Sequence, residues 1–154
     1  MNNVLRNSSL DIFFSKIRSE NKKIVFTNGC FDIIHPGHIH VLSQAKLLGH
    51  ILVVGLNSDK SVKKLKGKER PLVNESDRAK ILLSIKYVDY VTIFDESTPK
   101  DIIEKIKPDI LVKGGDYIVD DIVGSKFVID SGGRVEIVKF LDGYSSSNYI
   151  DNLN

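Results

Sequence analysis

Two histidines spaced three residues apart are the side chains in this sequence best suited to chemistry. His35 and His38 flank Pro36 and Gly37. Pro36 favours the first position of a helix, because its missing N–H is one that a helix start leaves unpaired. Residues three apart on a helix project from the same side, so both imidazoles can reach one group. With an ordinary pKa of about 6.5, each can donate a proton as a hydrogen bond to an oxygen that gains charge.

The start of this helix also favours an anion. It presents free N–H donors and the positive end of the helix dipole, and Gly37 has no side chain to keep a phosphate from the backbone. The structural alternative is that His35 caps the helix while His38 packs against a sheet. A zinc site would need three or four ligands, and neither the other histidines nor the one cysteine is placed to supply them. The spacing and the glycine therefore favour phosphate binding.

Apolar runs along the chain predict the elements that hold these histidines. An apolar run directly before the histidine segment predicts a buried strand, and a helical period of apolar residues follows it. Similar strands and helical patterns alternate along the chain, as in a parallel sheet with helices on both faces. The expected strands lie at 23–26, 50–56, 88–94, 109–112 and 134–140. The sequence therefore predicts an α/β fold, a Rossmann-like parallel sheet of five strands.

Length and charge narrow the class of protein. At 154 residues the chain suits a single domain, 1–154, in which a helix at 8–19 packs on a core at 23–150. There are 22 Lys and Arg residues against 20 acidic residues, so the net charge is too small for the electrostatic field of the whole protein to attract nucleic acid. There is one cysteine and no apolar run long enough for a membrane span. We expect a cytoplasmic protein without nucleic-acid or membrane partners.

A basic segment follows the second strand. It runs from Lys60 to Arg70, and Gly67 interrupts it. A lysine-rich loop beside a phosphate site can close over a triphosphate, so Lys66 is the first candidate and Lys64 the second, although charge runs are usually solvated faces. Arg78, near the start of the next helix, is either an exposed ion pair or a fork donor to phosphate.

Polar residues also follow other strands at the expected sheet edge. The segment 57–59 is either a helix cap or part of a nucleotide site. Gly114 and Gly115 come after the fourth strand, where open α/β sheets bind ligands. Three serines at 145–147 precede a final helical pattern, so one can cap that helix while the other two donate to phosphate.

The run from Thr27 to His38, with its His-x-Gly-His element, resembles the signature of the nucleotidyltransferase superfamily that includes cytidylyltransferases and small adenylyltransferases. Within that superfamily the chain is most similar to the adenylyltransferase domain that makes ADP-heptose from heptose 1-phosphate and ATP for the lipopolysaccharide core. Four stretches carry the resemblance: 26–38, 57–71, 111–117 (LVKGGDY) and 142–150.

Cytidylyltransferases acting on glycerol 3-phosphate or phosphoethanolamine are the nearest alternative. They carry an Arg-Thr-Glu-Gly-Ile-Ser-Thr-Thr run near the end, whereas this chain has Phe140-Leu141-Asp142-Gly143-Tyr144-Ser145-Ser146-Ser147 and lacks the arginine. The heptose family in turn usually has threonine where Ser146 and Ser147 stand, and commonly cysteine at Tyr144. The hydroxyl groups are kept, so phosphate binding is expected to be kept.

The resemblance implies direct in-line attack by the phosphate of heptose 1-phosphate on the α-phosphorus of ATP, with Mg²⁺ bridging the phosphates. In that mechanism His35 and His38 donate to the α-phosphate and to the leaving oxygen, and Lys66 and Arg78 hold the outer phosphates. Asp32 orients a histidine, binds the metal or caps the turn. The nucleotide-binding residues implied are Thr27, Asn28, Gly29, Phe31, Asp32, Lys64, Lys113, Gly114, Asp116, Ser145, Ser146 and Ser147.

Other classes of function remain open on the same residues. A catalytically silent nucleotide sensor would bind ATP without releasing pyrophosphate, and an RNA-contacting protein would use the segment 60–70. Relatives are often homodimers, so a homodimer is possible by analogy. Many relatives also carry a heptose kinase before this domain, and we expect that kinase to be a separate chain here.

Overall fold

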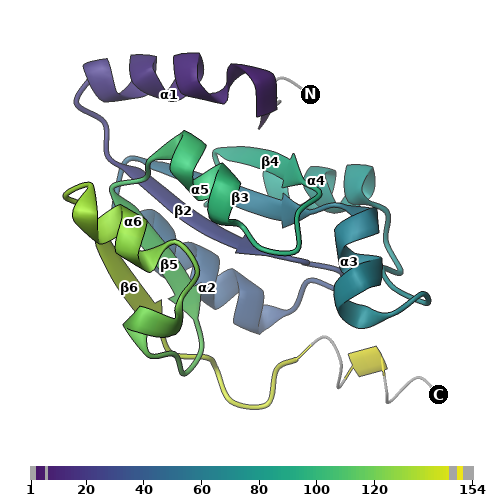
Figure 1. The fold of residues 1–154 in the computed structure, drawn as a ribbon. Helices are drawn as coiled ribbons and strands as arrows, with labels where there is room; N and C mark the ends of the chain where they lie inside the picture. Colours follow the sequence, from purple (N-terminus) through teal and green to yellow (C-terminus); the bar gives the residue numbers. More distant parts are fainter. Residues whose placement is uncertain (1–2, 6, 146–148, 151–154) are drawn as a thin grey trace.

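The computed structural model describes residues 3–5, 7–145 and 149–150, which form a parallel sheet with helices on both faces (Figure 1). Neighbouring strands pair in the order β1-β4-β3-β2-β5-β6, and every pairing is parallel. The predicted Rossmann-like parallel sheet is therefore confirmed. Its strands are β1 (Val4–Leu5), β2 (Ile24–Gly29), β3 (Ile51–Asn57), β4 (Tyr90–Phe94), β5 (Ile110–Gly114) and β6 (Arg134–Val138).

The prediction of five strands is wrong, because the described residues contain six. The additional strand, β1, pairs through Val4 and Leu5 with β4 at the edge of the sheet. Two residues are too few to show the alternation by which a strand is recognised in a sequence. The edge strand β1 is therefore recognised only in the structure, from its pairing with β4.

Helices connect the strands, and the helix start predicted at Pro36 is observed. The helix predicted at 8–19 begins at Leu10, after the 3-10 helix η1 (Asn7–Ser9). The helices are α1 (Leu10–Ser19), α2 (Pro36–Leu47), α3 (Asp59–Lys66), α4 (Glu75–Leu83), α5 (Lys100–Ile106), and α6 (Ser125–Asp130), with a second 3-10 helix, η2 (Val119–Asp121). None of the helices in the described residues is long and apolar enough to cross a membrane.

Two hydrophobic cores cover the two faces of the sheet. Along β2, Val25 points into one core while Ile24 and Phe26 point into the other, as the two-residue period of a strand requires. The core around Val25 contains buried residues of α2 and α4. The opposite core contains buried residues of α1, α5 and α6. Both faces of the central strands are buried, which explains their nearly continuous apolar sequences.

The strand order places a ligand crevice at a defined point. From β2 the chain continues through α2 to β3 and then β4 on one side, whereas β5 and β6 are added on the other side of β2. β2 and β5 are thus the neighbours at which the winding of the sheet reverses. Open α/β sheets bind ligands outside the carboxyl ends of the strands at this switch point.

The single-domain organisation stays a prediction, and the packing of α1 makes it testable. Phe14 of α1 is fully buried in the core that includes Phe26. If α1 belongs to the same cooperative unit, Phe14→Ala should lower the free energy of unfolding by about 3–5 kcal/mol, measured by urea denaturation. Ile12 lies on the same helix but is 80% exposed, so Ile12→Ala is the control and should have little effect. Equal, small effects of both variants would contradict a common core.

Candidate functional site

The two histidines lie where β2 turns into α2. Pro36 takes the first helical position of α2, and His35 takes the N-cap position with an extended backbone. The backbone N–H of His38 donates to the carbonyl of His35 at 2.9 Å, which closes the first turn. Phe31, in the turn before them, has a φ of 45°, in the left-handed region. The predicted strand and helix start are therefore observed, with a turn between them.

The imidazole rings of this turn stack on each other. The ring centroids of His35 and His38 are 3.8 Å apart, with an interplanar angle of 25°. Phe31 lies against His38 at 5.0 Å, and Tyr144 lies against His35 at 6.3 Å. A Cβ atom at Gly37 would come within 3.0 Å of the His35 ring. Glycine at this position therefore lets the two rings come together.

Burial sets the protonation state of both histidines. It lowers the pKa of His38 to about 4, with smaller contributions in the same direction from His35 and Lys66. Burial also lowers the pKa of His35. The Nδ1 atoms of both rings are buried without a hydrogen-bond partner among the described residues. Buried polar atoms normally have partners, so these two atoms are exceptions that the described residues do not satisfy.

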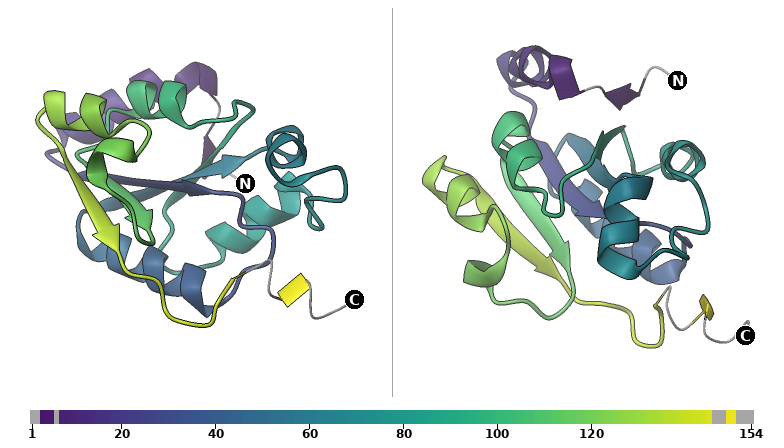
Figure 2. Two further views of the ribbon diagram at one scale, coloured as in Figure 1. Left: turned by 60° about the horizontal axis from the view of Figure 1, so that its bottom comes forward. Right: turned by 45° about the vertical axis from the view of Figure 1, so that its right-hand side comes forward.

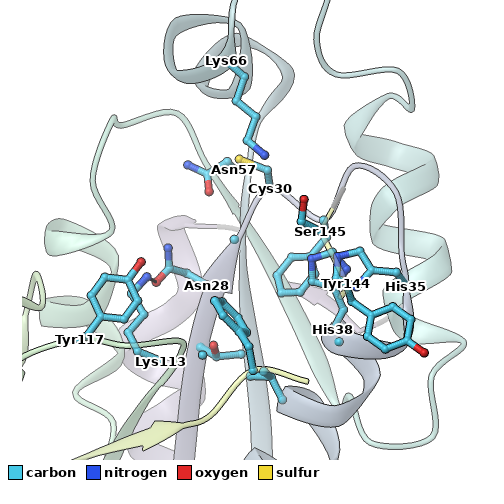
Figure 3. A pocket seen from close by; sticks show the side chains of 17 residues that line it. Asn28, Cys30, His35, His38, Asn57, Lys66, Lys113, Tyr117, Tyr144 and Ser145 are labelled. Carbon is cyan, nitrogen blue, oxygen red and sulfur yellow. Dashed lines mark hydrogen bonds between the residues drawn. The ribbon is translucent and has the colours of Figure 1, made fainter. Parts of the chain in front are cut away.

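These histidines line a cavity of about 460 Å³ at the carboxyl ends of the central strands (Figure 3). Lys66 reaches into it from one side, while Lys113 and Tyr117 lie on another side, away from the histidines. The segment that follows β6 passes the N-terminus of α2 (Figure 2) and contributes Tyr144. The lining residues are Thr27, Asn28, Gly29, Cys30, Phe31, His35, Gly37, His38, Val41, Asn57, Lys66, Lys113, Gly114, Tyr117, Phe140, Tyr144 and Ser145.

A lysine and an asparagine meet at the switch point of the sheet. The ammonium of Lys113, at the end of β5, donates to Oδ1 of Asn28 on β2 at 3.0 Å. Burial lowers the pKa of Lys113. None of the residues described as lining the cavity carries a carboxylate, so an anionic ligand is the counter-charge that would suit this ammonium best.

Arg78 is not placed in the cavity. Its side chain is fully buried, and its guanidinium donates to the carbonyl groups of Cys30, Asn57 and Val73 and to the carboxylate of Asp59. The distance to Asp59 is 2.8 Å. Those bonds engage all three guanidinium nitrogens, so the predicted contact of Arg78 with ATP phosphates has no support in this arrangement. The structure gives this arginine a different task, which is to join the turn after β2 to the end of β3.

Most of the other predicted residues do meet at the cavity, and a few do not. Asp32 is buried outside it, and Lys64 and Asp116 are exposed without lining it. Ser145 lines the cavity, whereas Ser146 and Ser147 fall outside the described residues. The ones that the structure brings together are Thr27, Asn28, Gly29, Phe31, His35, His38, Lys66, Lys113, Gly114 and Ser145.

Sequence reasoning missed several apolar and aromatic residues of the cavity. Tyr117 and Phe140 stand at its rim with 48% and 60% of their surfaces exposed. Each follows the end of a strand by a few residues, and large apolar side chains exposed at such an edge are the signal that could have found them. Asn57, for which a cap and a nucleotide role were both open, lines the cavity, while Ser58 caps α3 by accepting from the N–H of Ser61.

The residues of the site do not form a metal centre by themselves. The described part of the chain contains no cluster of three or more His, Cys, Asp or Glu side chains that could hold a metal ion. Mg²⁺ prefers carboxylate and phosphate oxygens, and the described residues that line the cavity offer amide oxygens but no carboxylate. We therefore assign no step of the reaction to a protein-bound metal.

Comparison with known proteins identifies the family. Residues 26–151 match the family described as cytidylyltransferase-like, over more than half of the chain. The chain belongs to this family. It is 51% identical over 148 residues to the bifunctional protein HldE of Citrifermentans bemidjiense, and 54% identical over 136 residues to that of Geobacter metallireducens. These alignments cover 94% and 88% of this chain but only 30% and 28% of the relatives.

A solved structure supports the same assignment. The lipopolysaccharide core biosynthesis protein of Thermoplasma volcanium superposes with a TM-score of 0.64 at 32% sequence identity. The superposition covers 80% of this chain and 99% of that protein. The nucleotidyltransferase family that the His-x-Gly-His element implied is therefore confirmed by the sequence comparisons and supported by this structure.

The lowered pKa of His38 predicts a pH dependence of stability. The folded-state pKa, about 4, lies below the ordinary value of 6.5, so the unfolded chain binds this proton first as the pH falls. The free energy of unfolding should therefore decrease from about pH 6.5 down to about pH 4, and His38→Gln should remove part of that decrease. Titration of the His38 Cε1 proton by NMR checks the pKa, with the urea-unfolded chain as reference. A midpoint near 6.5 in the folded protein would contradict the burial of this ring.

The contacts of Arg78 predict a structural effect. Arg78→Met removes the guanidinium donors to three backbone carbonyl groups and should lower the free energy of unfolding by about 3–5 kcal/mol in urea denaturation. Arg134→Met is the control, because Arg134 binds Glu136 on the surface, where ion pairs contribute at most about 1 kcal/mol. If Arg78→Met were as stable as the control, the arginine would not be needed for the fold.

Proposed function

We propose that this chain is an adenylyltransferase that transfers AMP from ATP to heptose 1-phosphate and releases pyrophosphate. Its product would be ADP-heptose for the lipopolysaccharide core. The main support is the pair of stacked imidazoles in a cavity at the N-terminus of α2. Each ring has a buried Nδ1 that lacks a partner among the described residues. The choice of ATP and heptose 1-phosphate as substrates is supported by the resemblance to the ADP-heptose-forming domain and by the HldE relatives, which are 51% and 54% identical in sequence.

The reaction needs positioning more than it needs acid–base chemistry. An oxygen of the sugar phosphate attacks the α-phosphorus of ATP and forms the new P–O bond. The bond from the α-phosphorus to the bridging oxygen breaks on the opposite side, and pyrophosphate carries away the electron pair. The acceptor phosphate is already an anion at neutral pH, so no base is required to activate it. The protein holds the two anions together and donates hydrogen bonds to the oxygens that gain charge.

The cavity residues suit the steps of that reaction. A neutral imidazole still carries one N–H, so His35 and His38 can each donate one hydrogen bond to the α-phosphate or the leaving oxygen. Lys66 lies where it can hold the outer phosphates, and Ser145 stands beside the histidines. Mg²⁺ would arrive with the phosphates of ATP, to which it supplies charge neutralisation. Arg78, proposed from the sequence as a phosphate ligand, acts instead on the backbone around the cavity.

A second candidate comes from the family description. Members of the cytidylyltransferase-like family match this chain from Phe26 onward, so a cytidylyltransferase acting on glycerol 3-phosphate or a similar small phosphate is the alternative. A nucleotide sensor without turnover is the alternative of another class. The cytoplasm, where ATP is available, is the compartment that our proposal requires, and a homodimer stays a prediction by analogy.

Incubation with ATP or CTP, Mg²⁺ and a panel of phosphates tests the proposal. The panel contains the two anomers of heptose 1-phosphate, glucose 1-phosphate and glycerol 3-phosphate, and released pyrophosphate is the readout. We expect release with ATP and one heptose 1-phosphate. Release only with CTP and glycerol 3-phosphate would establish the alternative, and ATP binding by calorimetry without any release would indicate a sensor.

The histidine role is tested in the same assay. His38→Ala should lower turnover by roughly 10², the scale for losing one preorganised donor to a charged transition state. His50→Ala is the matched control, because the ring of His50 binds the backbone N–H of Lys23 and does not line the cavity. Near-normal pyrophosphate release by His38→Ala, with a normal His50→Ala control, would overturn the role of the stacked pair.

A further inference from the structure

A buried carboxylate holds the connection between α3 and α4. Asp32 lies in the turn after β2, and only 2% of its surface is exposed. Its carboxylate accepts hydrogen bonds from Nε of Arg70 at 2.6 Å and from the backbone N–H groups of Leu72 and Val73 at 2.8 and 3.0 Å. These donors all belong to the same short connection, which runs from Gly67 to Asn74.

That connection begins at the lysine of the cavity. α3 ends at Lys66, and Gly67 follows with a φ of 100°, a backbone conformation that favours glycine. The N–H of Arg70 donates to the carbonyl of Gly67 at 3.1 Å, so a turn fixes Arg70 relative to the end of α3. Holding Arg70 against Asp32 therefore also fixes where α3 ends and where the Lys66 side chain starts.

Lys66 depends on its backbone for its position. Its side chain reaches toward Cys30 and into the cavity (Figure 3), but it makes no hydrogen bond or ion pair with the described residues. A lysine side chain has several rotatable bonds, and ordering it costs up to about 2 kcal/mol. A fixed starting point at the end of α3 reduces the conformations that a bound phosphate must still select.

Asp32 is not placed for the tasks that its sequence position had implied. It does not line the cavity, and its hydrogen bonds to the described residues go to the connection rather than to a histidine. Burial alone would raise the pKa of its carboxyl group, but the bonds from Val73, Arg70 and Leu72 lower that pKa overall. The group is thus held as an anion against a positively charged segment.

We propose that Asp32 is a positioning residue, which fixes the connection 67–74 over the turn after β2 so that Lys66 reaches the outer phosphates of the nucleotide. This inference rests on the proposed function. Val73 is bound from both sides, since Asp32 accepts from its N–H while Arg78 donates to its carbonyl at 2.8 Å. Arg78 also binds the carbonyl groups just after β2 and at the end of β3, whereas the hydrogen bonds of Asp32 to the described residues all go to the connection. Asp32 can therefore be altered with less effect on the sheet.

A double-mutant cycle on Asp32→Asn and Lys66→Met tests the proposal, with kcat/KM for ATP as readout. Asparagine keeps the shape and can still accept a backbone hydrogen bond, but it loses the charge that binds Arg70. We expect kcat/KM to fall about 10-fold in Asp32→Asn and further in Lys66→Met. The double variant should stay within about 2-fold of Lys66→Met, because a residue that acts only through Lys66 has no further effect once Lys66 is removed. If the fold-losses of the two single variants multiply in the double variant, the proposal is wrong, since a merely structural defect would lower kcat/KM independently of Lys66.

Two further variants secure the interpretation. Asp130→Asn is the matched control, because Asp130 forms an exposed ion pair with Lys126 at 2.8 Å and its loss should leave kcat/KM unchanged. Arg70→Gln breaks the ion pair between Arg70 and Asp32 from the arginine side. In the Lys66→Met background it should likewise cause no further loss of kcat/KM. This variant carries the test if circular dichroism shows that Asp32→Asn does not fold.

The failure of this inference can be told apart from failure of the proposed function. If the unmodified protein releases no pyrophosphate with any acceptor, the proposed function is wrong, and the cycle is then measured as the Kd for ATP by calorimetry. Weaker ATP binding in Asp32→Asn that disappears in the Lys66→Met background would still support the positioning role. Multiplying losses in Kd would overturn it in the absence of turnover as well.

Discussion

The architecture of the site depends on one buried guanidinium. Arg78 donates to the carbonyl of Cys30 after β2, the carbonyl of Asn57 at the end of β3 and the carbonyl of Val73 before α4. Desolvating this charge is costly, and the cost is acceptable only because every guanidinium nitrogen finds an acceptor, including the carboxylate of Asp59. The carboxyl ends of two central strands are thereby held in register with the loop that crosses them.

A second buried charge of opposite sign completes this constraint. Asp32 and Arg78 bind the two sides of the same peptide segment, the N–H and the carbonyl of Val73. Loops normally lie on the surface because their backbone groups need water as a partner. Here the two side chains replace that water, so the connection can approach the cavity and carry Lys66 to its edge. A hydrogen-bonded backbone that carries a lysine unpaired among the described residues is an arrangement that suits binding of a polyphosphate.

The sequence predicted what depends on local pattern and failed where distant segments meet. Apolar runs predicted the five longer strands and their parallel arrangement, and the spacing of His35 and His38 pointed to the cavity that both line. Sequence position placed Arg78 among the acidic residues of a helix start, where it was expected to be an exposed ion pair or a donor to phosphate. Its burial follows from contacts with residues 19 to 48 positions earlier in the chain, which no periodicity encodes. Asp32 was misjudged for the same reason, since its partners lie about 40 residues later.

The stacked histidines link the fold to the proposed chemistry through charge. Two imidazoles 3.8 Å apart cannot both be protonated cheaply, and the positive end of α2 opposes even one proton. The protein thus folds with neutral rings whose Nδ1 atoms lack partners among the described residues. A phosphate chain would reverse that balance, because its negative charge favours the protonated ring and its oxygens can accept from ring N–H groups. The histidines would therefore gain positive charge only when an anion occupies the site, which keeps two neighbouring imidazoles at a helix N-terminus compatible with a stable fold.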